Sequence, residues 1–366
     1  MHTFTKHILL LSTLTAVTSA AFANAAPSFS CCATDDSYQG RPDEHAPISV
    51  MGDHTHYKSG WMVSYRTMHM NMNGMRHGTD RVSSGDVFAK GYTVTPESMT
   101  MEMHMLGLMY APTDQLTLML MSNYTEIEMD HSIFSQMGAD MINNGDTKFT
   151  TETSGIGDIK LGGLYRFYLK ENRKAHFGLS LSLPTGSIDK KDTTPAMGGA
   201  ANQQLPAPMQ LGSGTYDLLP SLTYVQQFDN WSYGAQANAV IRLESENDNG
   251  YRLGDAFGTT AWVGTNLSEW VSLNTGLNYT YTSKLKGSQD DVASRGPNGS
   301  SVTTADESNT GGERLDAIFG INLYVPIGAL KGQRIAVDLH MPLWQDLNGY
   351  QLEADYVLTF GWQMAF

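Results

Sequence analysis

The sequence is poor in the residues that mark several common classes of protein. Its only two cysteines, Cys31 and Cys32, are adjacent, which is too few and too close for a disulfide framework. Charged residues make up 16% of the 366 residues, and 23 Lys and Arg against 37 Asp and Glu give a net charge of −14. This shortage of basic residues argues against a nucleic-acid partner. Beyond the N-terminal segment no run of 18 apolar residues occurs, so the sequence predicts no transmembrane helix.

The N-terminal segment has the pattern of an export signal. Lys6 and His7 precede an apolar stretch over residues 8–23, and two small-x-small sites follow at residues 21–25. This pattern predicts a cleaved signal peptide over residues 1–25. We therefore expect the mature chain to be exported.

Apolar and polar residues alternate through most of the remaining chain. At the C-terminus Phe366, Met364, Trp362 and Phe360 alternate with small or polar residues, which is the period of a β-strand. The same period predicts about 12 strands, over residues 58–70, 97–111, 115–129, 154–169, 174–185, 214–228, 231–244, 255–267, 270–285, 313–327, 333–343 and 351–366. Short connections strictly alternate with long ones, and the last long connection is expected at residues 344–350.

These features predict an all-β fold, namely a transmembrane antiparallel up-and-down β-barrel with short periplasmic turns and long outer loops. A terminal strand that ends in Phe resembles the C-terminal signature of bacterial outer-membrane barrels. We expect a signal peptide at 1–25, a periplasmic N-terminal extension at 26–56 and an outer-membrane barrel at 57–366. The expected partners are outer-membrane lipid and a small solute, and the expected state is a monomer. Loops and the N-terminal segment are candidates to plug the lumen.

With the apolar phase of each strand facing lipid, the other phase faces the lumen. It carries charges of both signs, which argues against a strongly ion-selective pore. These charges either pair to stiffen the wall or line a solute path. The predicted lumen residues are Arg66, Glu102, His104, Asp158, Lys160, Arg166, Arg242, Asp316, Asp338 and His340, with His176 and Arg334 in the same phase.

Methionine is concentrated in one region, because 16 of the 21 residues lie between Met51 and Met141. Thioether and imidazole are ligands that suit copper, so this region is a candidate for copper binding. The candidate ligands are His45, His54, His56, Met68, His69, Met70, Met72, Met75 and His77. Met99, Met101, Met103 and Met105 share one face of a strand, opposite Glu102 and His104. We expect that methionine face to contact lipid as an apolar surface.

The sequence lacks the motifs of the common enzyme classes. It has no GxSxG, no HExxH and no phosphate-binding loop. We therefore expect no enzyme, and lipid hydrolysis that depends on His176 or His340 remains as a third alternative.

Several segments resemble a known family. The stretches at residues 45–74, 99–119, 155–167 and 179–186, with Gly157-Asp158 at a strand start and Pro184-Thr185-Gly186 at a strand end, resemble the transporter-like outer-membrane family named for a putative MetA pathway of phenol degradation. The Met/His-rich stretches resemble a branch linked with copper. This resemblance implies a channel for small, hydrophobic or aromatic solutes. A copper-handling outer-membrane protein is the alternative.

Overall fold

Eleven antiparallel strands close into a barrel, and two further strands pair outside this closed path. The computed structural model describes residues 40–135, 138, 140, 143–195, 201–289, 292, 302–325, 327 and 331–366. The predicted signal peptide and Cys31-Cys32 lie outside the described residues. The barrel strands are β1 (Trp61–Gly78), β3 (Val94–Tyr110), β4 (Leu116–Ile133), β6 (Ile159–Lys170), β7 (Arg173–Leu183), β10 (Asp217–Gln227), β11 (Trp231–Arg242), β13 (Ala256–Asn266), β14 (Val271–Thr282), β16 (Gly312–Tyr324) and β17 (Gln333–Ala365).

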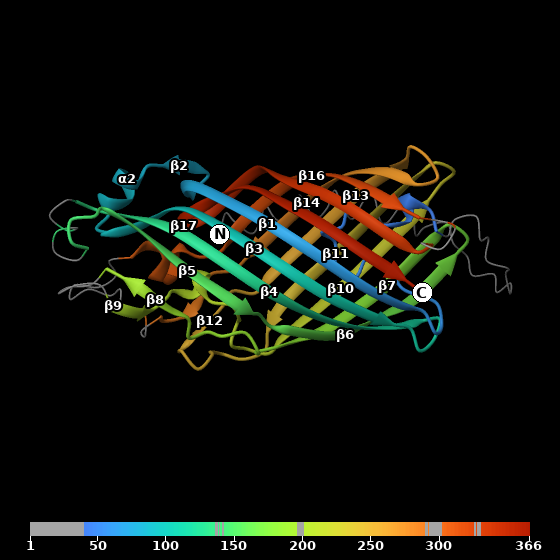
Figure 1. The fold of residues 1–366 in the computed structure, drawn as a ribbon, viewed down its shortest axis with the longest axis horizontal. Coiled ribbons are helices and arrows are strands. Elements are labelled where there is room, and N and C mark those ends of the chain that lie inside the picture. The colour runs from blue at the N-terminus through green and yellow to red at the C-terminus, as the bar shows by residue number, and fades with distance from the viewer. Residues whose placement is uncertain are drawn as a thin grey trace, which may run out of the picture. The chain divides into compact units, whose positions relative to one another are not determined.

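Each strand pairs with its neighbours in the chain, and β17 pairs with β1 to close the barrel. Closure leaves no open edge among these strands. The two outside strands are β2 (Asp80–Val82), which pairs with β1, and β5 (Lys148–Ile156), which pairs with β4 beyond β6. The predicted all-β antiparallel barrel is therefore confirmed (Figure 1).

The last strand is longer than the sequence pattern predicted. Residues 334–347 of β17 pair with β16, and residues 347–365 pair with β1. Gln345 and Ala354 exchange two hydrogen bonds of 3.0 Å, and the Arg334 Nη1 donates to Gln363 at 2.8 Å. These contacts bring the two halves of β17 together around a turn at Gly349, whose φ is 63°. The long loop expected at 344–350 is wrong, because strand pairing continues to this tight turn.

The apolar phase of the strands points outward. Phe360, Leu358, Leu179 and Leu277 are each 39–49% exposed, whereas Gln363 and Thr359, on the opposite phase of β17, are 2% exposed. On these strands the outer phase carries long apolar side chains and the interior phase carries mainly small or polar residues, as the period-2 pattern predicts.

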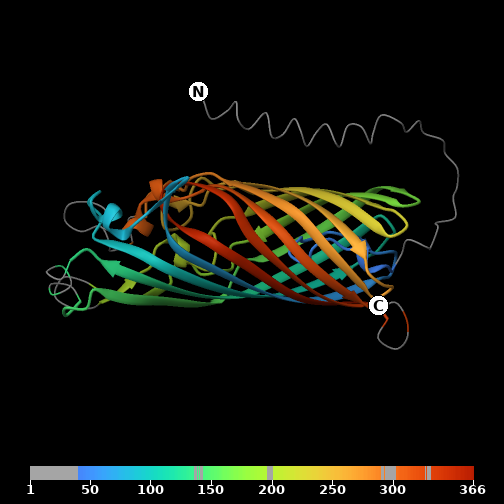
Figure 2. The same ribbon diagram turned by 90° about the horizontal axis from the view of Figure 1, so that it is seen from above.

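The connections differ at the two ends of the barrel. The turns after β3, β6, β10 and β13 are short, and they lie at the end where Phe366 terminates the chain (Figure 2). The other end carries β2, α2 (Ser84–Phe88), the hairpin of β8 (Lys191–Thr194) and β9 (Ala201–Gln204), and the pair β12 (Tyr251–Arg252) and β15 (Lys286–Gly287). None of the helices in the described parts of the chain is long and apolar enough to cross a membrane.

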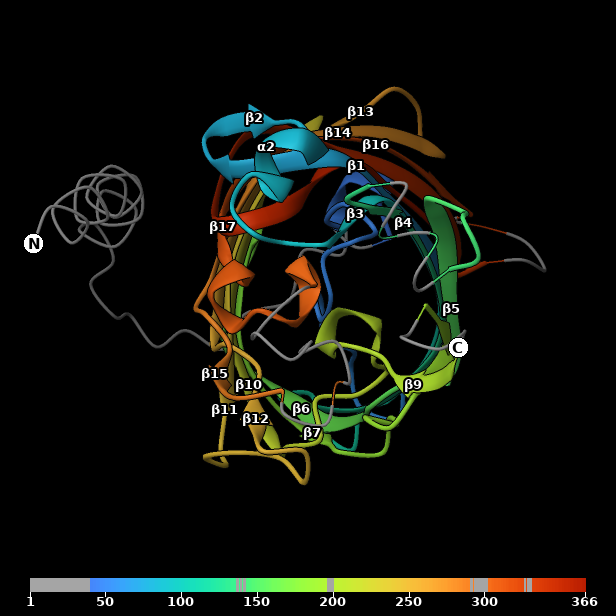
Figure 3. The ribbon, with the colours of Figure 1, turned by 90° about the vertical axis from the view of Figure 1, so that its left-hand side faces the viewer.

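Several connecting segments fold inward rather than away from the barrel. Figure 3, seen from the long-loop end, shows the short helices η4 (Thr303–Ala305) and η5 (Glu307–Asn309), in orange, inside the ring of strands. At the opposite end, residues 40–56 lie within the barrel; we call this segment the plug. It contains η2 (Pro42–Glu44), and Asp43, Ala46 and Ile48 are at most 1% exposed.

Candidate functional site

The inner face of three neighbouring strands is lined by methionine. In β1 and β3, Met68 lies opposite Met103, and Met70 lies opposite Met101. The interior phase is identified by Met62, Met99, Met109 and Met129, which are 2–6% exposed. We call this surface the methionine wall; it comprises Met62, Met68, Met70, Met72, Met75, Met99, Met101, Met103, Met105, Met109, Met119, Met121 and Met129.

The expectation that Met99, Met101, Met103 and Met105 face lipid is wrong, because they share the interior phase of β3. Glu102 and His104 are therefore not lumen residues. The Glu102 side chain is 48% exposed and lies 3.3 Å from His69, and the Tyr65 hydroxyl hydrogen-bonds to His104 at 2.8 Å on the outer face. The phase was misjudged because the outer face of β3 turns polar toward the long-loop end.

Apolar side chains from an inward loop cover part of the methionine wall. Met75, Met99 and Met129 form one buried cluster with Leu205 and Met209, and Met209 is fully buried. Met209 belongs to η3 (Ala207–Met209), which follows β9. The lumen surface of β1, β3 and β4 toward the long-loop end is therefore apolar, whereas the sequence pattern predicted charged residues there.

The plug is held by polar side chains of the barrel strands at the short-turn end. Arg334 Nη2 donates to the Ala46 carbonyl at 2.6 Å, and its guanidinium also donates to Asn322 and Gln363. The Arg334 side chain thus joins two strands to the plug backbone.

Three predicted lumen residues hold the middle of the plug. The Ser49 amide donates to Asp338 at 2.8 Å, and His340 Nε2 hydrogen-bonds to the Ser49 hydroxyl at 2.8 Å. His340 Nδ1 is 3.9 Å from Asp316, which is beyond hydrogen-bond reach. His176 Nε2 donates to the Gly52 carbonyl at 2.8 Å. These histidines therefore anchor the plug in this structure.

The remaining predicted lumen residues also lie on the interior phase or hold inward loops. Arg66 is 4% exposed and lies near Ile48 of the plug around Gly361. Arg166 stacks over Tyr57 at 4.5 Å. The contacts of the others are Asp158 with the Gly186 and Ser213 amides, Lys160 beside Asp158, Arg242 with Asp217, and Asp316 with Arg314.

The candidate copper ligands separate into three places. Met68, Met70, Met72 and Met75 belong to the methionine wall. His69 is on the outer phase of β1 beside Tyr356, and His77 lies beyond the bulge at Gly74, beside Tyr350. His45, His54 and His56 come together in the plug, where the ring centroids of consecutive members are 4.9 and 5.0 Å apart.

Electrostatics in the plug favour neutral His45 and His56 beside a charged Asp53. Burial, and then the Arg334 charge, lowers the pKa of His45 to about 4. Burial followed by the neighbouring His54 and His45 lowers the pKa of His56 to about 3. Burial alone raises the pKa of Asp53, but the charge of His54, the nearby His45 and the hydrogen bond with His54 hold it well below its usual range.

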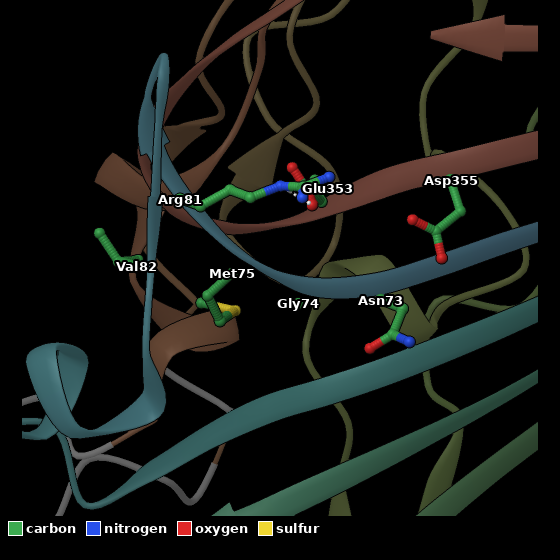
Figure 4. Close-up of a pocket in the computed structure, with 7 residues that line it drawn as sticks. All are labelled: Asn73, Gly74, Met75, Arg81, Val82, Glu353 and Asp355. Carbon is green, nitrogen blue, oxygen red and sulfur yellow. Dashed lines mark ion pairs between the residues drawn. The ribbon is translucent and has the colours of Figure 1, made fainter.

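A separate hollow of 340 Å³ opens beside β1 and β17 (Figure 4). Arg81 Nε lies 2.6 Å from Glu353, and Asp355 lines the same hollow. Register shifts in the β1–β17 pairing next to Met72 place Gly74 here, with a φ of 84°. The sequence analysis did not single out this hollow.

Uncharged residues of the site also escaped the sequence analysis. Asn322 and Gln363 bind the plug anchor Arg334, and Gln236 donates to the Met51 carbonyl at 3.0 Å. Met119, Met121 and Met129 extend the methionine wall to β4. For Asn322, Gln363 and Gln236, the available signal was their position on the small or polar phase of strands whose other phase is apolar.

The comparisons with known proteins agree on a barrel. The chain is similar to the crystal structure of an outer membrane channel from Pseudomonas putida F1, with 17% identity, a TM-score of 0.58 and coverage of 87% of this chain and 100% of that one. Weaker similarities are to a mutant of the TodX monoaromatic hydrocarbon channel (10% identity, TM-score 0.44, coverage 85% and 91%) and to the Ralstonia pickettii toluene transporter TbuX (10%, 0.41, 85% and 90%).

No curated protein matches the chain. Residues 88–310, more than half of the sequence, match the family described as putative MetA-pathway of phenol degradation. The chain therefore belongs to this family of outer-membrane transporter-like β-barrels.

Proposed function

We propose that this protein is a channel of the bacterial outer membrane that conducts small apolar solutes along the methionine wall. The observation that carries the proposal is the apolar, sulfur-rich lining of the lumen. Thioether side chains are flexible and polarisable, so they adapt to apolar molecules of different shapes. The family description, which names phenol degradation, supports an aromatic solute.

An apolar outer band supports the membrane location. Along β4, Leu118, Leu120 and Tyr124 are 40–46% exposed on the outer phase, and Glu126 and Glu128 follow on the same face. The nine residues Leu116–Tyr124 span about 23 Å when they rise about 3.3 Å each at a tilt of about 40°. This matches an apolar band of about 25 Å, so β4 extends beyond the outer leaflet.

The strand number fits the same proposal. Counting the two halves of β17 as separate strands gives twelve, the number that the sequence pattern predicted. An even number brings both ends of the barrel to the same side of the membrane, here the short-turn side. A barrel of this size leaves a lumen wider than that of an eight-stranded barrel, and the plug and the inward loops occupy it at opposite ends.

In this mechanism a solute enters between the inward loops, follows the methionine wall, and leaves when the plug is displaced. The charged groups near the short-turn end hold the plug and do not select ions. Because residues 40–56 lie inside the barrel and are bonded to its strands, we expect conduction to require their rearrangement.

Uptake of radiolabelled toluene by Gram-negative cells tests the proposal. Cells that produce the protein are expected to take up toluene faster than cells with an empty vector. Met101→Glu places a charge on the apolar path and is expected to lower uptake at least about 10-fold. The matched variant Met101→Leu keeps the path apolar and is expected to stay within about 2-fold of the wild type. Equal uptake in all four strains would refute the proposal.

One observation favours copper handling as a second candidate. On β3 and β4 the outward apolar residues are leucines, Leu106, Leu108, Leu118 and Leu120, whereas the inward ones are mostly methionines. Hydrophobicity alone does not require sulfur on one face only, and thioethers suit Cu(I). A Cu(I) titration against a chromogenic chelator decides between the two functions.

The variant for that titration replaces four methionines of the wall, Met68, Met70, Met101 and Met103, with leucine. Loss of tight Cu(I) binding in this variant would favour copper handling. Weak binding in the wild type, together with normal toluene uptake by the variant, would assign the methionine wall to apolar solutes.

A further inference from the structure

The plug contains a cluster of metal-ligating side chains that the channel function does not use. One ligand atom each from His45, Asp53 and His54 lies within 4.8 Å of the other two. His54 Nδ1 is 2.7 Å from one Asp53 carboxylate oxygen, and His45 Nδ1 is 3.8 Å from the other. His56 lies next to this group, with its ring 5.0 Å from that of His54.

Among the described residues, two nitrogen atoms of the cluster find no hydrogen-bond partner. His45 Nδ1 and His56 Nε2 are both inaccessible to solvent and unpaired. A buried polar atom without a partner costs about 1–3 kcal/mol, so its persistence calls for an explanation. A bound cation would satisfy both lone pairs at once.

The cluster lines a small cavity rather than a packed core. The cavity measures 160 Å³, and its lining includes His45, His54, His56 and Met62. This volume accommodates a metal ion and a water ligand, since a water molecule occupies about 30 Å³ in the liquid. The side chains of Arg334 and Glu44 line the same cavity with opposite charges, and both have protein partners.

Local chain geometry presents the ligands on one side of the plug. Gly52, with a φ of 62°, turns the backbone just before Asp53. The Ala46 amide donates to the Asp53 carboxylate at 3.3 Å, which ties the two ends of this turn together. His54 and His56 are two residues apart, and their ring centroids lie 5.0 Å from each other.

We propose that His45, Asp53, His54 and His56 form a binding site for a divalent first-row transition ion of the zinc or copper type. Three imidazoles and one carboxylate suit these ions, whereas calcium and magnesium prefer oxygen ligands throughout. Ligand bonds of about 2.0–2.1 Å bring the donor atoms closer together than 4.8 Å. Side-chain rotations supply that contraction, because the histidine rings border an empty cavity.

The bound ion would cross-link the two ends of the turn over residues 45–56. Since Ala46, Ser49 and Gly52 of this turn carry the anchors to the wall, the ion stabilises the docked plug. Binding itself does not depend on which solute the channel conducts, or on whether it conducts one.

The test uses the full mature chain, folded in detergent and stripped of metal with a chelator. Zn²⁺ and Cu²⁺ are titrated separately by competition with a chromogenic chelator, and Ca²⁺ serves as the negative control. We expect one ion per chain at sub-micromolar affinity for Zn²⁺ or Cu²⁺. The double substitution His54→Gln and His56→Gln is expected to weaken binding at least about 100-fold.

The matched control is the double substitution His69→Gln and His77→Gln, which removes two histidines of β1 that lie outside the plug and should leave affinity within about 2-fold. Circular dichroism verifies that each variant keeps its β-structure. If the His54/His56 variant does not fold, Asp53→Asn replaces it, with a smaller expected loss of about 10-fold.

Electron paramagnetic resonance of the Cu²⁺-loaded protein provides a second readout. Nitrogen hyperfine structure from several imidazoles is expected, and it should lose one nitrogen in the single variant His56→Gln. Absence of one-to-one binding, or equal loss of affinity in the His69/His77 control, would overturn the proposal.

Discussion

The plug should be released by a single substitution of Arg334. Arg334→Met keeps a long side chain but removes the charged hydrogen bond to the Ala46 carbonyl, which is 2.6 Å long. A hydrogen bond to a charged group contributes about 1.5–3 kcal/mol. Its loss should therefore increase the undocked population of the plug about 10- to 150-fold, since each 1.4 kcal/mol is about tenfold.

Amide hydrogen exchange measured by mass spectrometry reports this population directly. The Ser49 and Val50 amides donate to Asp338 and to the Pro47 carbonyl, so they exchange when the plug undocks. Their exchange rate should rise by the same factor in Arg334→Met, and planar-bilayer recordings should show more frequent opening. The control Arg252→Met removes an arginine that pairs with Asp255 at the long-loop end, away from the plug. Exchange that stays unchanged in the plug but rises in β16 and β17 would refute the anchoring role.

Three further predictions concern the plug and the outer face. Gly361→Ala places a Cβ 2.5 Å from Ile48 Cγ1, so plug amides should exchange faster while the barrel strands stay protected. Leu120→Arg should destabilise the barrel by about 2–4 kcal/mol in urea titrations in lipid bilayers, and a cost near zero would remove this position from the lipid. Burial raises the pKa of Glu44, but the charges of Lys174 and His45 and hydrogen bonds from Lys174 and the Gly40 amide together lower it to about 2. This ion pair therefore stabilises docking above about pH 4.5 and is lost as the pH falls toward 2. Lys174→Met should abolish that acid dependence of plug exchange, and an unchanged pH profile would contradict it.

The sequence predicted the barrel well where the outer face is uniformly apolar. In β7 and β14, residues such as Phe177, Leu179 and Leu273 alternate with small polar ones, and their outward phase is confirmed by exposures of 41–43%. Period 2 fixes the side of every residue once one side is known. The turn at Gly349 was not predicted as tight, since a run such as 344–350 lacks a clear alternation.

The methionine strand was assigned to the wrong phase for a physical reason. Sequence analysis took the charged phase of β3 as the interior, because the usual barrel has an apolar outside and a polar inside. Beyond the apolar band this contrast disappears, since Glu102 and Glu126 face outward above Leu108 and Leu120. A polar residue beyond the apolar band therefore does not indicate which face of the strand lines the lumen. The adjoining leucines on the same phase carried the correct signal.

The plug could not be placed from its sequence, because its contacts are almost all distant in the chain. Arg334 lies 288 residues from Ala46, and His176 lies 124 residues from Gly52. Most of these bonds go to plug carbonyls or amides, which any sequence provides, so the plug side carries little residue-specific signal.

The segments at the two ends of the lumen are held in place by different kinds of contact, and this difference bears on the proposed passage of a solute. At the long-loop end, Leu205 and Met209 lie against the methionine wall through apolar contacts, which an apolar solute replaces with contacts of the same kind. At the short-turn end the plug is held by directional bonds from Arg334, Asp338 and His340, for which such a solute offers no substitute. An apolar solute alone is therefore suited to entering the wall but not to releasing the plug. Opening at that end requires a change in the plug contacts themselves, such as those altered by Arg334→Met or Gly361→Ala. Wild-type chains should consequently bind toluene in the wall more readily than they conduct it, and the two plug variants should raise flux without raising binding. Fluxes that do not differ between wild type and variants would locate the barrier at the inward loops instead.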